Sequence, residues 1–284
     1  MTIDPSVPGP VRGPSLGAGS VVPDAHFAVP RLAGIYDDVE GDRSDLDAYV
    51  AMVQEFGSET VLDVGCGTGT LAVRLALAGV QVIGLDPAAA SIAVAQEKPG
   101  AERVRWIVGD ARSIPPAQVD LVTMTGNVAQ VFLSDGEWDD ALGASHSTLV
   151  PGGRLVFEVR DPAKEAWGEW TRERSYRLLD LPKVGPVETW VELTAVELPM
   201  VSFDTHFVFG SDSRTLTSSS TLRFRHRDEV VRALERAGFV IDGVRDAPDR
   251  PALELVFVAL RPRVIRSPAG DGSPVAGGGE RFGL

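Results

Sequence analysis

The sequence predicts an α/β protein: a doubly wound, seven-stranded, mostly parallel sheet with an antiparallel β insertion after strand 5. Three observations lead to this fold class. Short apolar runs alternate with helix-like segments up to Arg160, a glycine-rich turn follows the first of these runs, and period-two alternation replaces the helical spacing after Arg160. Alternating strands and helices place the strands parallel in one sheet, whereas period-two runs are typical of half-buried antiparallel strands.

Hydrophobic spacing and end signals define the elements of the first half. A helix is expected over residues 44–56, with Ser44 as N-cap and Gly57 as stop. The Ser134–Glu137 capping pair opens another over residues 135–148. Further helices are expected over residues 71–78 and 88–97, and strands over residues 61–64, 81–85, 104–108, 119–125 and 154–160.

The second half begins with the predicted insertion, in which apolar and polar side chains alternate along residues 187–193 and 203–209. The GSDS segment at 210–213 is typical of a hairpin turn, and a third strand is expected over residues 215–225. This sheet would cover a pocket mouth or form a dimer interface. The core then resumes with a helix over residues 228–237 and strands over residues 240–244 and 252–260.

Composition divides the chain into five segments. Both ends are rich in Pro, Gly and Ser without a helical or strand period, and are expected to be flexible. The expected segments are a flexible start (1–22), a cofactor-binding core (23–162), the antiparallel insertion (163–227), the completion of the core (228–261) and a flexible tail (262–284).

The turn after the first strand carries the clearest chemical signal. Gly65, Gly67 and Gly69 allow positive φ angles and a close approach of ligand to backbone. A dinucleotide-binding turn has its third glycine one residue later, where this chain has Thr70. The spacing therefore departs from the pattern that holds a pyrophosphate.

Two acidic residues near this turn further limit the kinds of ligand that could bind there. Asp63 lies two residues before the first glycine, where it would repel a pyrophosphate but could accept hydrogen bonds from an ammonium group. Asp86 ends the second strand, at the position where a carboxylate binds both ribose hydroxyls. A cationic, phosphate-free nucleoside fits this pair best.

These features, in this order, resemble the class I S-adenosylmethionine-dependent methyltransferases. The resemblance continues with Gly109–Asp110–Ala111 after the third strand, the fourth strand, and the turn at 149–153. It implies a Rossmann-like methyltransferase fold, S-adenosyl-L-methionine as cofactor, and methyl transfer to an O or N atom of a small molecule. It also implies the cofactor-binding residues Tyr36, Arg43, Asp63, Gly65, Cys66, Gly67, Thr68, Gly69, Asp86, Pro87, Gly109, Asp110, Ala111, Thr125 and Gly126. For Arg43, a salt bridge to a neighbouring acid is the alternative, and Cys66, the sole cysteine, is expected simply to fill a small position.

Catalysis would depend mainly on alignment, because methyl transfer from a sulfonium is an in-line displacement that needs no metal; pre-organised approach can contribute about 7 to 11 kcal/mol. Asn127, after the fourth strand, is expected near the methyl group, and Tyr36 is expected to close over the donor. His206 and His226 are the candidate bases, since imidazole titrates near neutral pH, with a plain surface position as the alternative.

The acceptor is expected beyond the fifth strand. Arg160 ends this strand, and Trp167 and Trp170 follow at helical spacing, so all three could line the acceptor pocket. Packing in the core is the alternative for the two tryptophans. The N-P-P-Y type signature of amide- and adenine-methylating relatives is absent after strand four, which disfavours those acceptors.

Charge and composition limit the partners. The 284 residues carry a net charge of −13, which argues against nucleic acid as a substrate. No apolar run reaches the length of a membrane span, and one cysteine offers no disulfide framework, so a cytoplasmic protein is expected. A small-molecule acceptor and a homodimer through the insertion are the expected partners.

Two other functions stay open. A protein with this site could bind S-adenosylmethionine without methylating, as an assembly subunit or a catalyst of a rearrangement. An NAD(P)-dependent oxidoreductase is disfavoured by Thr70, which stands where the third glycine of its turn should be.

Overall fold

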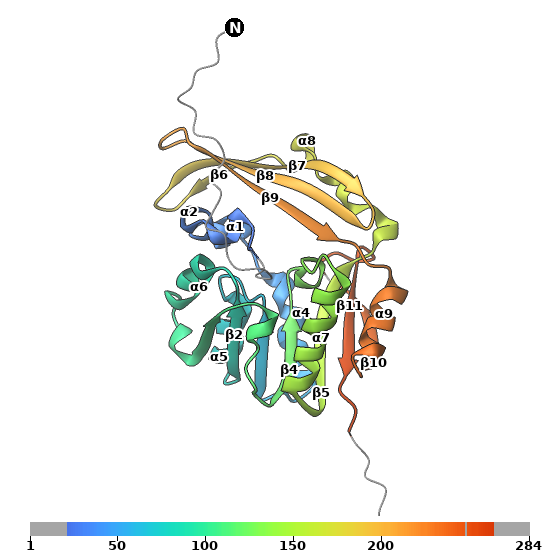
Figure 1. The fold of residues 1–284 in the computed structure, drawn as a ribbon. Coiled ribbons are helices and arrows are strands. Elements are labelled where there is room, and N and C mark those ends of the chain that lie inside the picture. The colour runs from blue at the N-terminus through green and yellow to red at the C-terminus, as the bar shows by residue number, and fades with distance from the viewer. Residues whose placement is uncertain (1–21, 248, 264–284) are drawn as a thin grey trace, which may run out of the picture.

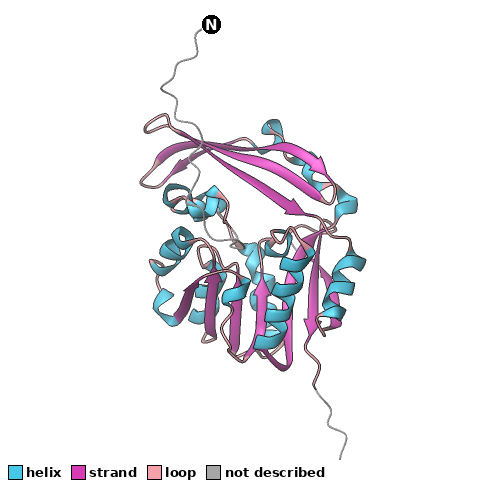
Figure 2. Cartoon of the chain, viewed as in Figure 1, coloured by secondary structure: helices cyan, strands magenta, loops and turns pink. Residues whose placement is uncertain are grey.

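The protein is described from a computed structural model, in which residues 22–247 and 249–263 are placed. Two sheets form two layers (Figure 1), and the smaller one lies over the carboxyl ends of the parallel strands of the larger one (Figure 2). The expected flexible ends lie almost wholly outside the described residues. None of the described helices is long and apolar enough to cross a membrane.

The larger sheet has seven strands in the order β10-β11-β5-β4-β1-β2-β3. β1 to β5 are parallel, and β11 runs antiparallel to both of its neighbours. The chain moves outward from β1 in one direction and returns to β4 on the other side, so the loops after β1 and β4 diverge and leave a crevice between them. The strands are β1 (Thr60–Val64), β2 (Gln81–Asp86), β3 (Val104–Val108), β4 (Val119–Met124), β5 (Leu149–Arg160), β10 (Val240–Asp246) and β11 (Glu254–Leu260).

Helices pack on both faces of this sheet (Figure 2) because its strands are apolar on both sides. On one face, Trp138 of α7 packs edge-on against Phe157 with ring centroids 5.3 Å apart, and Phe157 stacks on Phe257 at 5.4 Å. On the other, α4 and α5 pack on Val61 and Val82. The helices are α4 (Asp47–Glu55), α5 (Thr70–Leu77), α6 (Ala89–Gln96), α7 (Asp135–Thr148) and α9 (Arg227–Arg236).

The smaller sheet, here called the lid sheet, is antiparallel with the order β6-β7-β8-β9. Its strands are β6 (Arg177–Leu181), β7 (Gly185–Glu197), β8 (Met200–Phe209) and β9 (Thr215–Arg223), preceded by the short helix α8 (Arg172–Ser175). Three further short helices, α1 (Ala25–Ala28), α2 (Pro30–Ala33) and α3 (Tyr36–Glu40), precede the core in the chain. Leu32 and Ile35 of this segment pack against Phe207 and Phe209 of the lid sheet, which joins the two layers.

The predicted fold class is confirmed, with differences in local detail. The helix at 135–148 has the predicted bounds and a complete Ser134–Glu137 capping box. Ser44, however, is not an N-cap: residues 44–46 form a 3₁₀ turn, and the Ser44 hydroxyl donates to Asp42 at 2.9 Å. The lid sheet has a fourth strand, β6, that the sequence pattern did not reveal, because its five residues RLLDL lack a period-two alternation.

Candidate functional site

The glycine-rich turn joins β1 to α5 and has left-handed backbone at all three glycines, with φ of 71° at Gly65, 55° at Gly67 and 78° at Gly69. A Cβ at Gly69 would lie 2.4 Å from the ring of Trp106, so this glycine is also required by packing. A Cβ at Gly67 would meet nothing within 4 Å among the described residues. The outer side of the turn is packed and the side at Gly67 is open, as ligand approach requires.

Cys66 fills a small position in this turn, as expected. Its Sγ lies where a Cβ at Gly84 of β2 would be only 3.1 Å away. Burial raises the pKa of the thiol well above its ordinary value, which keeps it neutral. A reactive role for Cys66 therefore has no support here.

Asp63, on β1, is buried, and only one of its two carboxylate oxygens has a hydrogen-bond partner in the described structure. Thr123 Oγ1 donates to its Oδ1 at 2.8 Å, whereas Oδ2 has no hydrogen-bond partner within the described part of the chain. Burial, reinforced by the charges of Asp86 and Glu158, raises the pKa of Asp63 to about 7. A buried carboxylate with an unpartnered oxygen costs free energy, and a bound cation would relieve that cost.

Asp86, at the end of β2, reaches back to the turn. Its two oxygens accept the backbone N–H of Gly67 at 2.8 Å and the backbone N–H of Ala88, just after Pro87, at 2.7 Å. Burial raises its pKa despite these bonds. Each oxygen keeps a second lone pair, so ribose hydroxyls could still donate to it.

The segment Gly109–Asp110–Ala111 follows β3, as expected for the acid that would contact adenine. Asp110 opens a 3₁₀ turn by accepting the backbone N–H of Arg112 at 3.0 Å, and its carboxylate also pairs with the Arg112 guanidinium. Its side chain is therefore held in place at the end of β3 by local bonds. A Cβ at Gly109 would lie 2.4 Å from Ser113, so this position excludes larger side chains.

The loop after β4 is fixed by a buried acid that sequence reasoning did not single out for this role. Gly126 and Asn127 both have positive φ, and the Asn127 N–H donates to Glu158 Oε1 at 2.7 Å. Tyr49 of α4 donates to the other oxygen of Glu158. Burial raises the pKa of Glu158 to about 7. Asn127 Oδ1 is left buried and unpartnered in the described structure, next to Thr125 and the crevice.

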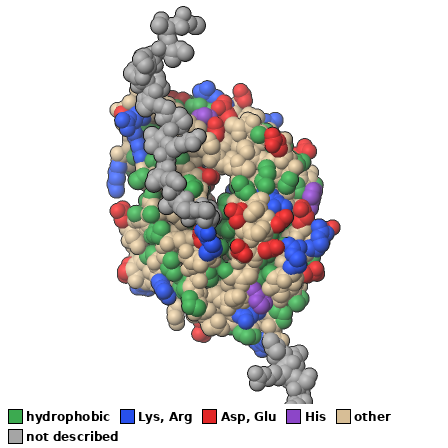
Figure 3. All heavy atoms as spheres, viewed as in Figure 1, with side chains coloured by type: hydrophobic (Ala, Val, Ile, Leu, Met, Phe, Trp, Pro, Cys, Tyr) green, Lys and Arg blue, Asp and Glu red, His purple; other side chains and the backbone are tan. Residues whose placement is uncertain are grey.

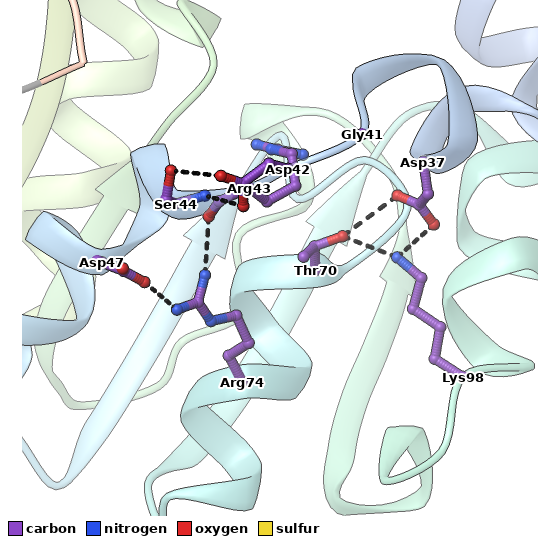
Figure 4. A pocket seen from close by; sticks show the side chains of 9 residues that line it. All are labelled: Asp37, Gly41, Asp42, Arg43, Ser44, Asp47, Thr70, Arg74 and Lys98. Atoms are coloured by element: carbon purple, nitrogen blue, oxygen red, sulfur yellow. Dashed lines mark hydrogen bonds and ion pairs between the residues drawn. The ribbon is translucent and has the colours of Figure 1, made fainter. Parts of the chain in front are cut away.

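The helix α3 is bound to the glycine-rich turn through Asp37, a residue the sequence analysis did not name. Thr68 Oγ1 donates to Asp37 at 2.6 Å, and Lys98 Nζ forms an ion pair with it at 2.6 Å. Figure 4 shows Asp37, Thr70 and Lys98 pointing toward one another. The three residues line an open cleft of about 460 Å³. The same cleft is lined by Arg43, whose guanidinium pairs with Asp45 at 3.0 Å. The salt-bridge alternative for Arg43 is therefore the arrangement in this structure.

Tyr36 lies in an aromatic cluster with His26 and Phe27 of α1, with ring centroids 5.2 and 5.6 Å away. Burial raises its pKa, so its hydroxyl stays protonated. His26 is a further residue of this region that sequence reasoning missed. It lies between Tyr36 and Phe207 of the lid sheet, whose ring is 4.9 Å from the imidazole. A lone histidine in a four-residue helix gives no sequence signal for such a position.

The expected acceptor residues separate into two environments. Trp167 is buried and packs edge-on against Phe224 at 4.7 Å, so it belongs to the core, as in the alternative interpretation. Trp170 packs on Phe203 at 4.6 Å and remains half-buried. Arg160 lies over the Trp170 ring at 5.4 Å and pairs with Glu254 at 3.3 Å.

The two histidines expected as bases do not face the crevice. His206 alternates with Phe207 on β8; because Phe207 packs toward the core, His206 points to the outer face of the lid sheet. There it stacks on Trp190 at 4.9 Å and bonds to Glu192 at 2.9 Å. His226 is exposed at the start of α9. The expectation of a catalytic role for His206 is corrected by this geometry.

The part of the chain that forms this crevice is similar to known proteins. Residues 61–153 match a family model described as a methyltransferase domain. The chain is 35% identical over 126 residues to a demethylmenaquinone methyltransferase of Thermus thermophilus, covering 42% of this chain and 56% of that protein. It is 32% identical over 120 residues to a cypemycin N-terminal methyltransferase of a Streptomyces species, covering 42% and 49%. The chain thus spans about half the length of the curated relatives it matches.

Solved structures extend the similarity to the whole fold. The sugar N-methyltransferase KedS8 of a Streptoalloteichus species superposes with a TM-score of 0.68 at 20% identity, covering 89% of this chain and all (100%) of that one. CalS10, an amino pentose methyltransferase of Micromonospora echinaspora, gives a TM-score of 0.61 at 23% identity, covering 80% and 96%. At these identities the superpositions show the fold alone.

Proposed function

We propose that this chain, a member of the class I S-adenosylmethionine-dependent methyltransferases through its domain at residues 61–153, transfers a methyl group to an O or N atom of a small molecule. When bound, S-adenosylmethionine supplies an electrophilic methyl group on a sulfonium. The chain's own residues would bind the donor, orient the acceptor and exclude water. In such a displacement, positioning contributes about 7 to 11 kcal/mol.

The observation that carries the proposal is the state of Asp63. Its Oδ2 is buried without a partner in the described structure, beside a turn that is open at Gly67. A pyrophosphate would place negative charge against this acid, which is unfavourable at short range. The ammonium group of S-adenosylmethionine would instead supply the missing donor and the missing positive charge.

The other expected cofactor contacts are part of the same proposal. Asp86 would accept from the ribose hydroxyls, and the segment Gly109–Ala111 would contact adenine. Thr125, Gly126 and Asn127 would lie along the methionine part, where the Asn127 Oδ1 is buried without a partner among the placed residues. Tyr36 would cover the donor, and Arg43 would meet its carboxylate only by exchanging its bond to Asp45.

The acceptor class rests on the enclosing lid sheet and on the relatives. A site between two layers suits a molecule of moderate size, and two proteins of similar fold are named for amino pentose and sugar methylation. The reacting atom is not fixed by the relatives, because they also include a demethylmenaquinone methyltransferase. We therefore propose a small polar acceptor, with Arg160 and Trp170 at one end of its site.

Calorimetry with the purified protein tests the donor. We expect S-adenosylmethionine and its demethylated product to bind at micromolar concentrations and NAD to show no heat of binding at millimolar concentrations. Asp63→Asn should weaken both adenosyl ligands strongly. Saturation with NAD, and no response to S-adenosylmethionine, would overturn the proposal.

A protein that binds S-adenosylmethionine without methylating gives a different result. With the methyl group isotopically labelled, a methyltransferase moves one label into the acceptor for each S-adenosylhomocysteine released. A rearrangement catalyst or an assembly subunit leaves the label on the donor. The same incubation therefore separates these functions.

A homodimer through the lid sheet is a separate proposal about partners. Leu178 of the edge strand β6 is 63% exposed, and Tyr176, just before this strand, is 42% exposed, so both could pack against a second copy. Sedimentation of the wild type and of Leu178→Asp tests it. A monomer in both proteins would contradict the dimer.

A further inference from the structure

The inner face of the lid sheet, which faces the core, is apolar at both ends and polar in its middle. At one end Phe207 and Phe209 pack on Leu32 and Ile35. At the other, Val201 and Leu222 pack with Trp167 and Phe224. Next to these clusters and between them, the paired rows of the sheet place hydroxyl side chains and Val191 on the same inner face. The hydroxyls are those of Thr189 of β7, Thr205 of β8, and Ser218 and Ser220 of β9.

This polar middle lies over the segment that carries α1. Ser220 Oγ donates to the carboxylate of Asp24 at 2.6 Å, and the His26 backbone N–H donates to Ser218 Oγ at 2.9 Å. Burial raises the pKa of Asp24. Thr189 and Ser218 are buried by this packing, whereas Thr205 and Ser220 stay half-buried. The accessible part of the polar middle therefore suits a polar ligand between the layers. The space-filling view is hollowed between the lid sheet and the core (Figure 3).

The imidazole of His26 is the group in this region that could accept a proton. Its ring is held on three sides by Phe27, Tyr36 and Phe207, with centroids 4.9 to 5.2 Å away. Its Nε2 is buried and has no hydrogen-bond partner among the residues the structure describes. Leaving such a nitrogen without a hydrogen bond costs about 1–3 kcal/mol. A ligand that donates a hydrogen bond to it would recover this free energy.

The same segment also touches the proposed donor site. The Phe27 carbonyl accepts a hydrogen bond from Ser91 Oγ of α6 at 3.0 Å, and α6 begins three residues after Asp86. Tyr36, the expected cover of the donor, is in contact with His26. His26 therefore lies between the polar middle of the lid sheet and the crevice that would hold the methyl donor.

We propose that the hydroxyl-lined middle of the lid sheet binds a hydroxyl-bearing acceptor and that His26 Nε2 accepts the proton from the hydroxyl that is methylated. This rests on the proposed methyl transfer and names its acceptor class and base. A bond forms between the acceptor oxygen and the methyl carbon. The carbon–sulfur bond breaks with its electron pair left on sulfur, and the hydroxyl proton moves to His26.

The environment of His26 favours oxygen over nitrogen as the reacting atom. Burial lowers the pKa of His26 to about 4, so the imidazole is neutral and able to accept a proton at pH 7. A hydroxyl becomes a strong acid as its oxygen gains the methyl group, so even a weak base removes its proton. A methylated amine remains far more basic than this imidazole and would not transfer its proton to it.

The test uses S-adenosylmethionine with a ¹³C-labelled methyl group and a protein-free small-molecule extract of the source cells. We expect one labelled product whose ¹³C shift is that of an O-methyl group. His26→Phe keeps an aromatic ring against Tyr36 and Phe207, and should lower kcat by about 10²–10⁴-fold, the usual contribution of a general base. The affinity for S-adenosylhomocysteine, measured by calorimetry, should change by less than about threefold, well within the tenfold that 1.4 kcal/mol represents.

Two further variants separate catalysis from folding. His26→Ala should regain part of its rate when imidazole is added, which a purely structural role would not allow. His206→Phe, the matched change on the outer face of the lid sheet, should leave kcat within about twofold, as is usual for surface positions away from a site. In histidine NMR spectra the purified product should shift His26 and not His206.

The possible outcomes distinguish a failure of this inference from a failure of the proposed function. An N-methyl or C-methyl product, or an unchanged rate in His26→Phe, overturns the assignment of His26 and leaves the methyltransferase intact. Donor binding with no labelled product from the extract overturns methyl transfer to a small molecule and the inference with it. A wild-type protein without affinity for S-adenosylmethionine removes the donor site on which both depend.

Discussion

Asp63 should couple cofactor binding to proton release. The buried carboxyl has a pKa of about 7 without ligand, and an adjacent ammonium group would lower it. Binding near pH 7 should therefore release a proton, and affinity should rise as pH increases from about 6 to 8, through the pKa of Asp63. Calorimetry in two buffers with different ionisation enthalpies measures the protons released. Glu158→Gln, which removes the other acid of similar pKa, should retain the release, whereas Asp63→Asn should lose it.

The same residue should weaken the ligand-free fold. The pKa of Asp63 is raised from 3.8 to about 7 on folding, so the folded state holds more protons between these values. Its stability therefore decreases as pH rises through this range. Asp63→Asn should stabilise the ligand-free protein by about 2–4 kcal/mol at pH 8 and by little at pH 4. Urea unfolding at the two pH values measures this; equal effects at both would contradict the ionised state assigned here.

At the scale of elements, two glycines of the same turn should respond differently to alanine. Gly69→Ala would drive a Cβ to 2.4 Å from Trp106 and 2.8 Å from Ala95, so the protein should lose at least about 2 kcal/mol of stability. Gly67→Ala meets open space and should lose about 1 kcal/mol from backbone strain alone. Because the open side is where the ligand would approach, Gly67→Ala should lose more affinity for S-adenosylhomocysteine than stability. Thermal unfolding and calorimetry on both variants give the comparison, and equal losses of affinity and stability in Gly67→Ala would argue against an open ligand face.

The sequence predicts best those helices and strands whose own residues carry a cap, a stop or a clear apolar run. The helix at 135–148 follows from its capping box, and the parallel strands follow from short apolar runs bounded by glycines. Ser44 fails as a cap because Asp42 accepts both its hydroxyl and its backbone N–H, a competition between neighbours that spacing cannot reveal. The strand β6 is defined by its pairing with β7 rather than by its own pattern.

The residues of the candidate site also differ in whether a local sequence signal identifies them. The turn and its acids were found because they follow strand ends, a position set by the fold class. His26, Asp37 and Tyr49 were not found, since each acts through a contact with a residue distant in sequence, and such contacts exist only after the layers assemble. His206 was misassigned because period two identifies two faces of a strand without indicating which one is inside.

At the scale of the whole molecule, the two layers are joined at the ends of the lid sheet and through the segment 24–40. This segment contacts the glycine-rich turn through Asp37, α6 through Phe27, and β9 through His26. We infer that this segment covers the proposed donor site and that donor exchange opens it, so a bound donor should hold it closed.

Hydrogen exchange with and without S-adenosylhomocysteine tests this coupling. At 100 times its Kd the ligand stabilises the folded state by about 2.7 kcal/mol, and amides of residues 24–40 should slow more than those of α9, which is remote from the turn. Asp37→Asn removes the ion pair with Lys98 and should speed exchange in this segment without ligand. Asp139→Asn, which breaks the surface pair with Arg236, is the matched control and should have no such effect. Slowing that is equal in residues 24–40 and in α9 would mean that the ligand stabilises the fold globally and that the segment is no gate to the site.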